Sequence, residues 1–160
     1  RDVGSGNIGT TNVLRTGKKS LAIATLLLDI LKGYVSVVIT FKYFNDLVYF
    51  SSLICFIAHI FPVWLKFKGG KGVATYLGIV FALSFKFGII FCITWLLISF
   101  IFKYSSLASM VGALVLFAYS ITLDSTILSI FLFITFIIIL YTHRENILRL
   151  KDSKETKIKL

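Results

Sequence analysis

The chain has 160 residues, of which 58% are hydrophobic and only 15% charged, and its formal net charge is +10. A soluble domain is usually about 45–50% apolar and about 25% charged. This composition therefore excludes a soluble globular domain, and it excludes disorder because a disordered chain needs few apolar residues. In a soluble protein the positive excess would suggest nucleic acid, but in a membrane protein it indicates cytoplasmic loops and anionic lipid headgroups, so we expect no nucleic-acid partner.

Six apolar segments approach the length of about 20 helical residues that crosses the hydrocarbon core of a bilayer. They predict an all-α fold, a polytopic membrane helix bundle with six spans in a single domain over residues 1–160. The six segments are residues 21–40, 48–65, 73–85, 87–102, 104–122 and 126–142. The two cysteines, Cys55 and Cys92, lie inside these apolar runs, which favours buried packing residues over a disulfide or a metal site.

The first segment carries two ionisable residues, Asp29 and Lys32, three positions apart on one helical face. Ionisable groups inside a span are costly, and they usually face a bundle interior or water. An ion pair near the interface that only fixes the helix explains the same two residues. Both interpretations stay open at this point.

The basic residues predict the orientation of the bundle. With the N-terminal segment in the cytoplasm and six alternating spans, only Lys42 and Lys86 lie outside, and Lys32 lies within a span. All other lysines and arginines then face the cytoplasm, as the positive-inside rule requires. We therefore expect the polar N-terminal segment, the loop before residue 73 and the C-terminal tail to meet on the cytoplasmic face.

The N-terminal segment Gly4-Ser5-Gly6-Asn7-Ile8-Gly9 formally matches the dinucleotide-binding pattern G-x-G-x-x-G. That pattern needs a preceding strand and a βαβ unit, and only three residues precede it here, so a Rossmann site is excluded. What remains is a polar loop in which Ser5 and Asn7 can form hydrogen bonds and Arg15 can bind a phosphate through its planar fork. An ordinary polar loop is the alternative.

A second glycine-rich segment, residues 68–72, reads Lys-Gly-Gly-Lys-Gly and immediately precedes the third apolar run. Glycines let a backbone approach a ligand closely, and the amides and dipole of a helix N-terminus favour phosphate. The segment is not a Walker A loop, because Leu65 and Gly72 stand where that loop needs Gly and Ser or Thr. The alternative is a flexible interfacial turn whose lysines contact lipid headgroups.

A third polar segment places His143 and Asn146 three positions apart where the sixth predicted span meets the cytoplasm. On a continuing helix these two side chains share a face. A histidine at this position can act as a general base near neutral pH. A structural histidine is the alternative.

Together the three polar segments resemble the bacterial family of membrane glycerol-3-phosphate acyltransferases that use acyl phosphate as donor. Members carry GSGNxGxTN…R, HxFP…FKGGKGVAT and HxxNI…RL segments in this order, and all three read through this chain. An Asp-x-x-Lys-Gly stretch from Asp29 and a Tyr-Ser-Ser-Leu-Ala-Ser stretch from Tyr104 also match. The resemblance implies an enzyme of phospholipid synthesis that makes lysophosphatidic acid and phosphate from acyl phosphate and glycerol 3-phosphate, with no cofactor and no metal.

The resemblance also implies the roles of individual residues. His143, Asn146 and Ser5 are expected to be catalytic, with His143 and Asn146 orienting or deprotonating the attacking hydroxyl; the substrate's own phosphate stays open as the base. Glu155 is expected to be a structural partner for a nearby cation. The residues expected to bind the substrates are Asn7, Arg15, Lys68, Gly69, Gly70, Lys71 and Gly72.

Two departures from the family pattern leave alternatives open. Family members generally have seven spans, and this chain is expected to lack the first of them; Lys103 also stands where an arginine is common. A truncated inactive paralogue or a membrane scaffold is therefore one alternative. A small anion transporter is another, although only Asp29 and Lys32 are charges of the kind it needs. The expected partners are glycerol 3-phosphate, acyl phosphate and the lipid bilayer, in the bacterial cytoplasmic (inner) membrane.

Overall fold

The computed structural model describes residues 8–14 and 16–158, and this described part of the chain is helical, with no strand. The all-α fold class predicted from the apolar segments is therefore confirmed. The chain divides into two compact units, residues 1–84 and residues 85–160, and each is described by itself. The predicted single domain is not tested by this division and stays a prediction.

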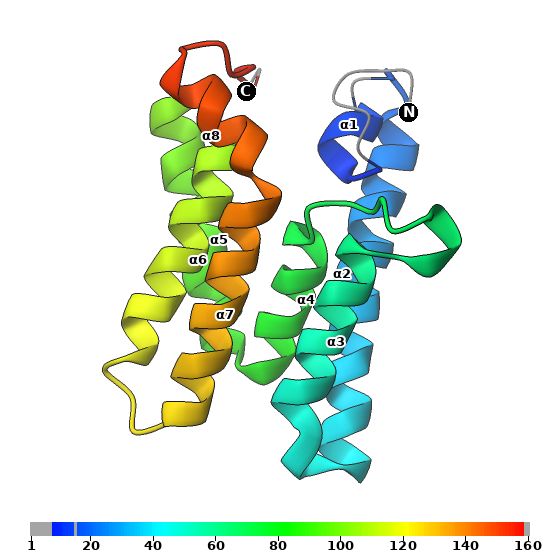
Figure 1. Cartoon of the computed structure of the whole chain (residues 1–160), viewed down its shortest axis with the longest axis vertical. Helices are drawn as coiled ribbons and strands as arrows, with labels where there is room; N and C mark the ends of the chain where they lie inside the picture. Colours follow the sequence, from blue (N-terminus) through cyan, green and yellow to red (C-terminus); the bar gives the residue numbers. More distant parts are fainter. Residues whose placement is uncertain (1–7, 15, 159–160) are drawn as a thin grey trace. The chain divides into compact units, whose positions relative to one another are not determined.

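The first unit packs its helices around the long helix α2 (Figure 1). At 25 residues, α2 is long enough to cross a bilayer, and it contacts α1, α3 and α4. The elements of the unit are α1 (Thr10–Leu14), α2 (Lys19–Tyr43), the 3₁₀ helix η1 (Asn45–Leu47), α3 (Val48–Ile60), the 3₁₀ helix η2 (Val63–Leu65) and α4 (Val73–Leu83).

Two glycines allow α2 and α4 to approach each other closely. A Cβ atom added to Gly33 of α2 would collide with the backbone carbonyl of Thr75, and one added to Gly78 of α4 would collide with the carbonyl of Ile30. Small residues bring helix backbones together in this way in membrane proteins, where packing rather than the hydrophobic effect drives association. The start of α4 is therefore held firmly against the middle of α2.

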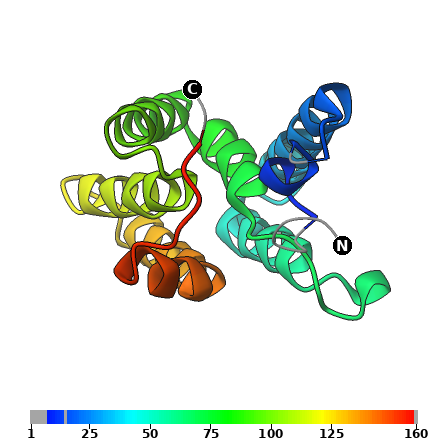
Figure 2. The same cartoon turned by 90° about the horizontal axis from the view of Figure 1, so that it is seen from above.

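The second unit is a row of three long helices followed by a short one. Figure 2 shows α6 between α5 and α7, in agreement with its contacts to both. The Trp95 indole N–H donates to Ser109 Oγ at 3.1 Å and joins α5 to α6. The elements are α5 (Phe85–Phe102), α6 (Ser105–Ser120), α7 (Thr126–Thr142) and α8 (Arg144–Lys151). The chain bends by 61° between α7 and α8.

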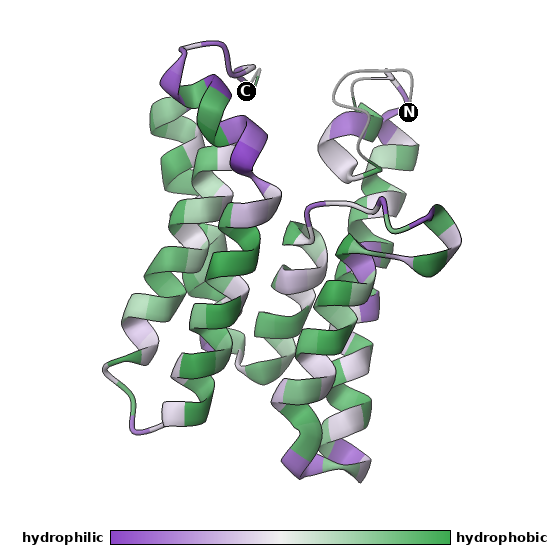
Figure 3. Ribbon diagram, viewed as in Figure 1, coloured by the Kyte–Doolittle hydropathy of each residue, from purple (hydrophilic) through white to green (hydrophobic). Residues whose placement is uncertain are grey.

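Apolar residues line the helices, and hydrophilic residues gather near helix ends and loops (Figure 3). Each of the six predicted segments contains one α-helix, but their number as membrane spans stays a prediction. By length and composition, three helical segments among the described residues can cross a membrane, or four if α7 and α8 form one bent span. Helices α4 and α6, with 11 and 16 residues, are apolar but shorter.

One predicted segment, residues 48–65, is broken in the structure. Helix α3 ends at Ile60, and Pro62 adopts an extended conformation (φ −69°, ψ 129°) before the 3₁₀ helix η2 begins. Proline has no N–H to donate to a helix, and it restricts the residue before it to non-helical conformations. The break turns the chain toward the glycine-rich loop.

Candidate active site

The glycine-rich segment Lys68–Gly72 is docked on the C-terminal end of α3. The Gly69 N–H donates to the Ile60 carbonyl at 2.9 Å, and the Gly70 N–H donates to the His59 carbonyl at 3.3 Å. Gly70 is buried, and a Cβ atom there would collide with the His59 imidazole. The two amides are thus engaged with the α3 backbone, so these glycines fix the position of the loop.

The loop ends at the N-terminus of α4, which offers the groups that favour an anion. Gly72 has a φ of 82°, a conformation that glycine adopts without strain. The first bond of α4 runs from the Tyr76 N–H to the Gly72 carbonyl at 2.8 Å, so the amides of residues 73–75 point out of the helix end. With the exposed Lys68 and the half-buried Lys71 beside them, these amides form a candidate anion site.

Three ionisable residues join α2 to α3 beside the loop. Lys32 Nζ lies 2.6 Å from Asp29 Oδ1 and 2.5 Å from His59 Nδ1. The sequence left open whether Asp29 and Lys32 only pair with each other, and the contact with His59 shows that they also bridge two helices. They border a cavity of about 170 Å³ lined by Ile8, Thr25, Asp29, Lys32, Ala58, His59, Pro62, Trp64 and Leu65.

His143 stands at the junction of α7 and α8 in the second unit. Its side chain is buried, and Nδ1 lies 2.8 Å from the Ile139 carbonyl. A carbonyl oxygen only accepts hydrogen bonds, so Nδ1 carries the proton of the neutral ring, and Nε2 is an acceptor. This tautomer of His143 suits a general base that acts through Nε2.

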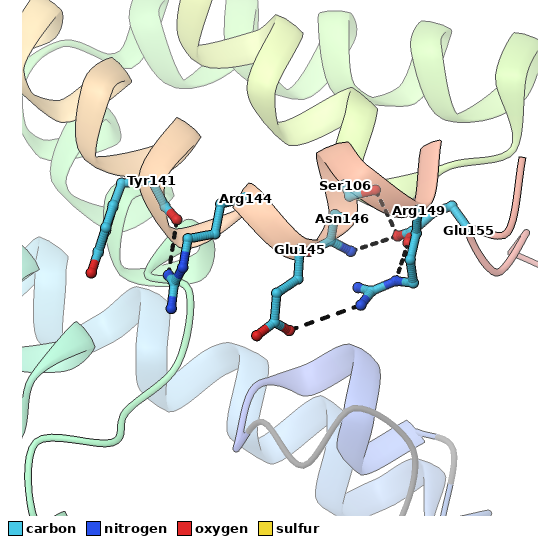
Figure 4. Close-up of polar contacts among 7 residues, drawn as sticks. All are labelled: Ser106, Tyr141, Arg144, Glu145, Asn146, Arg149 and Glu155. Atoms are coloured by element: carbon cyan, nitrogen blue, oxygen red, sulfur yellow. Dashed lines mark hydrogen bonds and ion pairs between the residues drawn. The ribbon is translucent and has the colours of Figure 1, made fainter. Parts of the chain in front are cut away.

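Asn146 belongs to a polar network centred on the Glu155 carboxylate (Figure 4). Glu155 Oε1 accepts hydrogen bonds from Asn146 Nδ2 at 2.6 Å and from Ser106 Oγ at 2.8 Å, and Oε2 accepts one from Arg149 Nε at 2.8 Å. Burial raises the pKa of Glu155, but the hydrogen bonds from Arg149, Asn146 and Ser106 and the charge of Arg149 outweigh it, so the pKa lies below its ordinary value. The carboxylate is thus ionised at neutral pH.

The structure places most of the predicted site residues in two groups, one in each unit. Lys68, Gly69, Gly70, Lys71 and Gly72 lie together in the first unit, and His143, Asn146 and Glu155 belong to the second. Three other predicted residues, Ser5, Asn7 and Arg15, lie outside the described residues.

Neither His59 nor Ser106 was among the predicted site residues. His59 contacts the glycine loop, and its place at the start of the HxFP segment is a signal that the sequence does contain. Ser106 contacts Glu155 across 49 positions of the chain. Only the Tyr-Ser-Ser-Leu-Ala-Ser stretch hinted at it, and nothing in the local sequence connects that stretch to the C-terminal tail.

Apolar helices of spanning length are typical of an integral membrane protein, and here they carry a candidate anion site at the end of one helix and buried polar groups at the end of another. The family model described as glycerol-3-phosphate acyltransferase matches residues 1–153. The chain belongs to this family.

Named relatives agree with this assignment. A glycerol-3-phosphate acyltransferase of Pelagibacter ubique is 52% identical over 160 residues, covering 100% of this chain and 83% of that protein. One of Mesorhizobium japonicum is 46% identical over 158 residues, covering 99% of this chain and 81% of that protein.

Two solved structures share the fold. The crystal structure of PlsY (YgiH), an integral membrane glycerol 3-phosphate acyltransferase, in its glycerol 3-phosphate form matches with a TM-score of 0.94 at 36% identity, covering 99% of this chain and 82% of that chain. Its lysophosphatidic acid form matches with a TM-score of 0.92 at 36% identity, covering 98% and 82%. The chain is thus an integral membrane protein with the PlsY fold.

Proposed function

We propose that this protein transfers a fatty acyl group from acyl phosphate to the 1-hydroxyl of glycerol 3-phosphate, giving lysophosphatidic acid and inorganic phosphate. Membership of the glycerol-3-phosphate acyltransferase family supports the acyl transfer. The matched structures, described as glycerol 3-phosphate and lysophosphatidic acid forms, support the acceptor and the product. The donor, acyl phosphate, is proposed from the motif pattern.

The observation that carries the proposal is the glycine loop docked on α3, with Lys68 and Lys71 beside the amides that open α4. Both proposed substrates carry a phosphate, and an acyl phosphate is already activated for attack. The protein then has mainly to position two anions and stabilise the negative charge that develops on the carbonyl oxygen. Ser5, Asn7 and Arg15 are proposed to complete the phosphate contacts.

In the proposed reaction the 1-hydroxyl oxygen attacks the acyl carbonyl carbon, and the bond from that carbon to the phosphate oxygen breaks. The hydroxyl proton goes to His143 Nε2, which the Ile139 contact makes an acceptor, and passes on to the released phosphate. Asn146 orients the hydroxyl, and Glu155 holds Asn146 in place through the 2.6 Å hydrogen bond. Catalysis is thus assigned to His143 and Asn146, and to Ser5 through its proposed phosphate contact, and a structural role is assigned to Glu155.

The location of the reaction is part of the proposal. The distribution of basic residues supports a multi-pass protein of the bacterial cytoplasmic membrane, with the motif loops and the C-terminus in the cytoplasm. One integral-membrane acyltransferase domain over residues 1–160 is proposed to carry the whole activity.

The test supplies purified protein in lipid vesicles with acyl phosphate and radiolabelled glycerol 3-phosphate. We expect labelled lysophosphatidic acid without added acyl carrier protein or coenzyme A. A matched pair of variants, Lys71→Met and Lys66→Met, tests the loop, because Lys71 lies in the loop next to the start of α4 and Lys66 precedes the loop. Label that enters vesicles without being acylated indicates a transporter, and a product only from acyl coenzyme A contradicts the proposed donor.

A further inference from the structure

The glycine loop is held at both ends by adjacent residues of α2. On one side Lys32 contacts His59, 27 positions further along the chain, and the His59 carbonyl and imidazole contact Gly70. On the other side Gly33 lies against the backbone of Thr75 in the first turn of α4. One turn of α2 therefore sets the distance between the helix that precedes the loop and the helix that follows it.

The contacts of Lys32 also fix the orientation of the His59 ring. An ammonium group only donates hydrogen bonds, so His59 Nδ1 accepts and the proton of the neutral ring is on Nε2. Of all the atoms near a Cβ built on Gly70, His59 Nε2 is the closest. The ring thus presents its Nε2–H side to the loop, and its side chain is only 5% exposed, which leaves it little freedom to rotate.

Asp29 and Lys32 can form an ion pair within α2 without His59. Asp29 and Lys32, at three positions apart on one helix, satisfy each other at 2.6 Å. The additional contact with His59 takes Lys32 across to α3, and Asp29 Oδ1 also lies 3.6 Å from His59 Nδ1. Charged groups in a membrane helix are costly and tend to be functional. Because His59 contacts Gly70, the contact between Lys32 and His59 acts on the glycine loop.

We propose that Asp29, Lys32 and His59 are positioning residues that hold the glycine loop in the geometry that binds a substrate phosphate. The inference rests on the proposed function, because it takes a phosphate as the ligand of the loop. Asp29 holds the Lys32 ammonium, Lys32 holds the His59 ring, and the ring supports Gly70. None of the three needs to touch the substrate, so their loss changes binding more than the chemical step.

The experiment measures KM and kcat for both substrates in three variants purified as the full chain. Lys32→Met removes the donor, Lys32→Arg keeps a donor, and Lys42→Met removes a lysine near the C-terminal end of the same helix as a matched control. We expect Lys32→Met to raise the KM for one phosphate substrate about ten-fold or more with kcat changed less than about three-fold. Lys32→Arg should restore most of the affinity, and Lys42→Met should leave both constants unchanged.

A double variant tests whether the effect passes through His59. Gly70→Ala forces a Cβ atom against the imidazole, and Lys32 and Gly70 share His59 as a neighbour. If both substitutions displace the same loop, the KM of Lys32→Met/Gly70→Ala equals that of the more severe single variant instead of the product of the two effects. The proposal is overturned if the effects of the two substitutions on KM multiply. It is also overturned if Lys32→Met has the same KM as the Lys42→Met control, or if Lys32→Met lowers kcat alone.

A second measurement separates this inference from the proposed reaction. Stabilisation of the protein by inorganic phosphate, read as a shift of the melting temperature, reports on the loop whether or not acyl phosphate is the donor. We expect a clear shift in the wild type and the Lys42→Met control and a much smaller one in Lys32→Met. An inactive wild type that phosphate still stabilises contradicts only the proposed function, whereas equal shifts in all variants overturn the positioning role. If Lys32→Met does not purify, Asp29→Asn replaces it in every comparison.

Discussion

His59 and His143 carry the proton of the neutral ring on opposite nitrogens. Nδ1 of His59 accepts from Lys32 at 2.5 Å, whereas Nδ1 of His143 donates to the Ile139 carbonyl at 2.8 Å. Hydrogen-bond partners assign the tautomer of a histidine, so His59 is protonated on Nε2 and His143 on Nδ1. The only two histidines of the sequence are thus prepared for different tasks, one as a donor facing a loop and the other as an acceptor.

Nitrogen-15 NMR of histidine-labelled protein in detergent micelles measures this difference directly. We expect one ring with an unprotonated Nδ1 and one with an unprotonated Nε2, and the spectrum of His143→Ala identifies which signals belong to His59. Lys32→Met should redistribute the proton of His59 over both nitrogens and leave the signals of His143 unchanged. Two rings with the same tautomer in the wild type would contradict the assignment.

Substitution of His143 tests the general base. His143→Ala removes Nε2, and because a positioned base contributes about 10²- to 10⁴-fold to a rate, we expect kcat to fall by about 100-fold or more with acyl phosphate as donor. The control is Arg144→Ala, which removes an exposed neighbour that contacts Tyr141. Unchanged turnover in His143→Ala would show that the substrate's own phosphate takes the proton.

Glu155→Gln tests the network of the C-terminal tail. Arg149 loses the negative charge of its 2.8 Å partner, and we expect the free energy of unfolding to fall by about 1.5–3 kcal/mol, the range for a hydrogen bond to a charged group. Glu145→Gln is the matched control, because Glu145 is 73% exposed and lies 3.9 Å from the same arginine. Thermal unfolding in detergent should show little change for this control.

The stabilisation by Glu155 should also depend on pH. The pKa of Glu155 in the folded protein lies below its ordinary value of 4.5, so the folded state binds the proton less readily than the unfolded state does. The contribution is present above the unfolded pKa and is lost as the pH falls through the folded pKa. The difference in stability between the wild type and Glu155→Gln should therefore be constant near neutral pH and shrink below 4.5. A difference that does not change with acidification contradicts the assigned network.

Gly78→Ala tests the close packing of α2 and α4. The added Cβ atom meets the Ile30 carbonyl, which is backbone and cannot rotate away, so we expect a loss of about 1–3 kcal/mol from overpacking. In the control Gly112→Ala, the nearest atoms belong to the Phe91 ring, which can shift, and alanine favours the helix by about 1 kcal/mol. Melting temperatures should therefore rank Gly112→Ala above Gly78→Ala. The reverse order would contradict the role given to Gly78.

Local sequence patterns predicted where most helices lie, but they did not predict every helix end or the contacts between helices. Long apolar runs with polar ends give α2, α5 and α7 close to their predicted bounds, because helix formation depends on neighbours along the chain. The end of α3 at Ile60 was missed within the segment 48–65, although Pro62 marks it. The predicted segment extends past Pro62 because residues 63–65 are also apolar.

In the candidate site, too, contiguous motifs were predictable from the sequence and contacts between distant residues were not. The cationic glycine loop is visible in residues 68–72 because it is contiguous. The link from Lys32 to His59 joins residues 27 positions apart on two helices, and that from Ser106 to Glu155 joins residues 49 positions apart. Such contacts depend on how helices pack, which no pattern of a single segment encodes.

The bend between α7 and α8 coincides with a change in the kind of residue along the chain. Helix α7 carries no charged residue, while α8 begins with Arg144 and Glu145, so His143 stands where the chain passes from uncharged to charged sequence. In the proposed reaction the acyl chain of the donor dissolves in the membrane and glycerol 3-phosphate in water, so we expect the two substrates to meet at the boundary between them. As the proposed base, His143 lies at this transition, where we expect the two proposed substrates to meet.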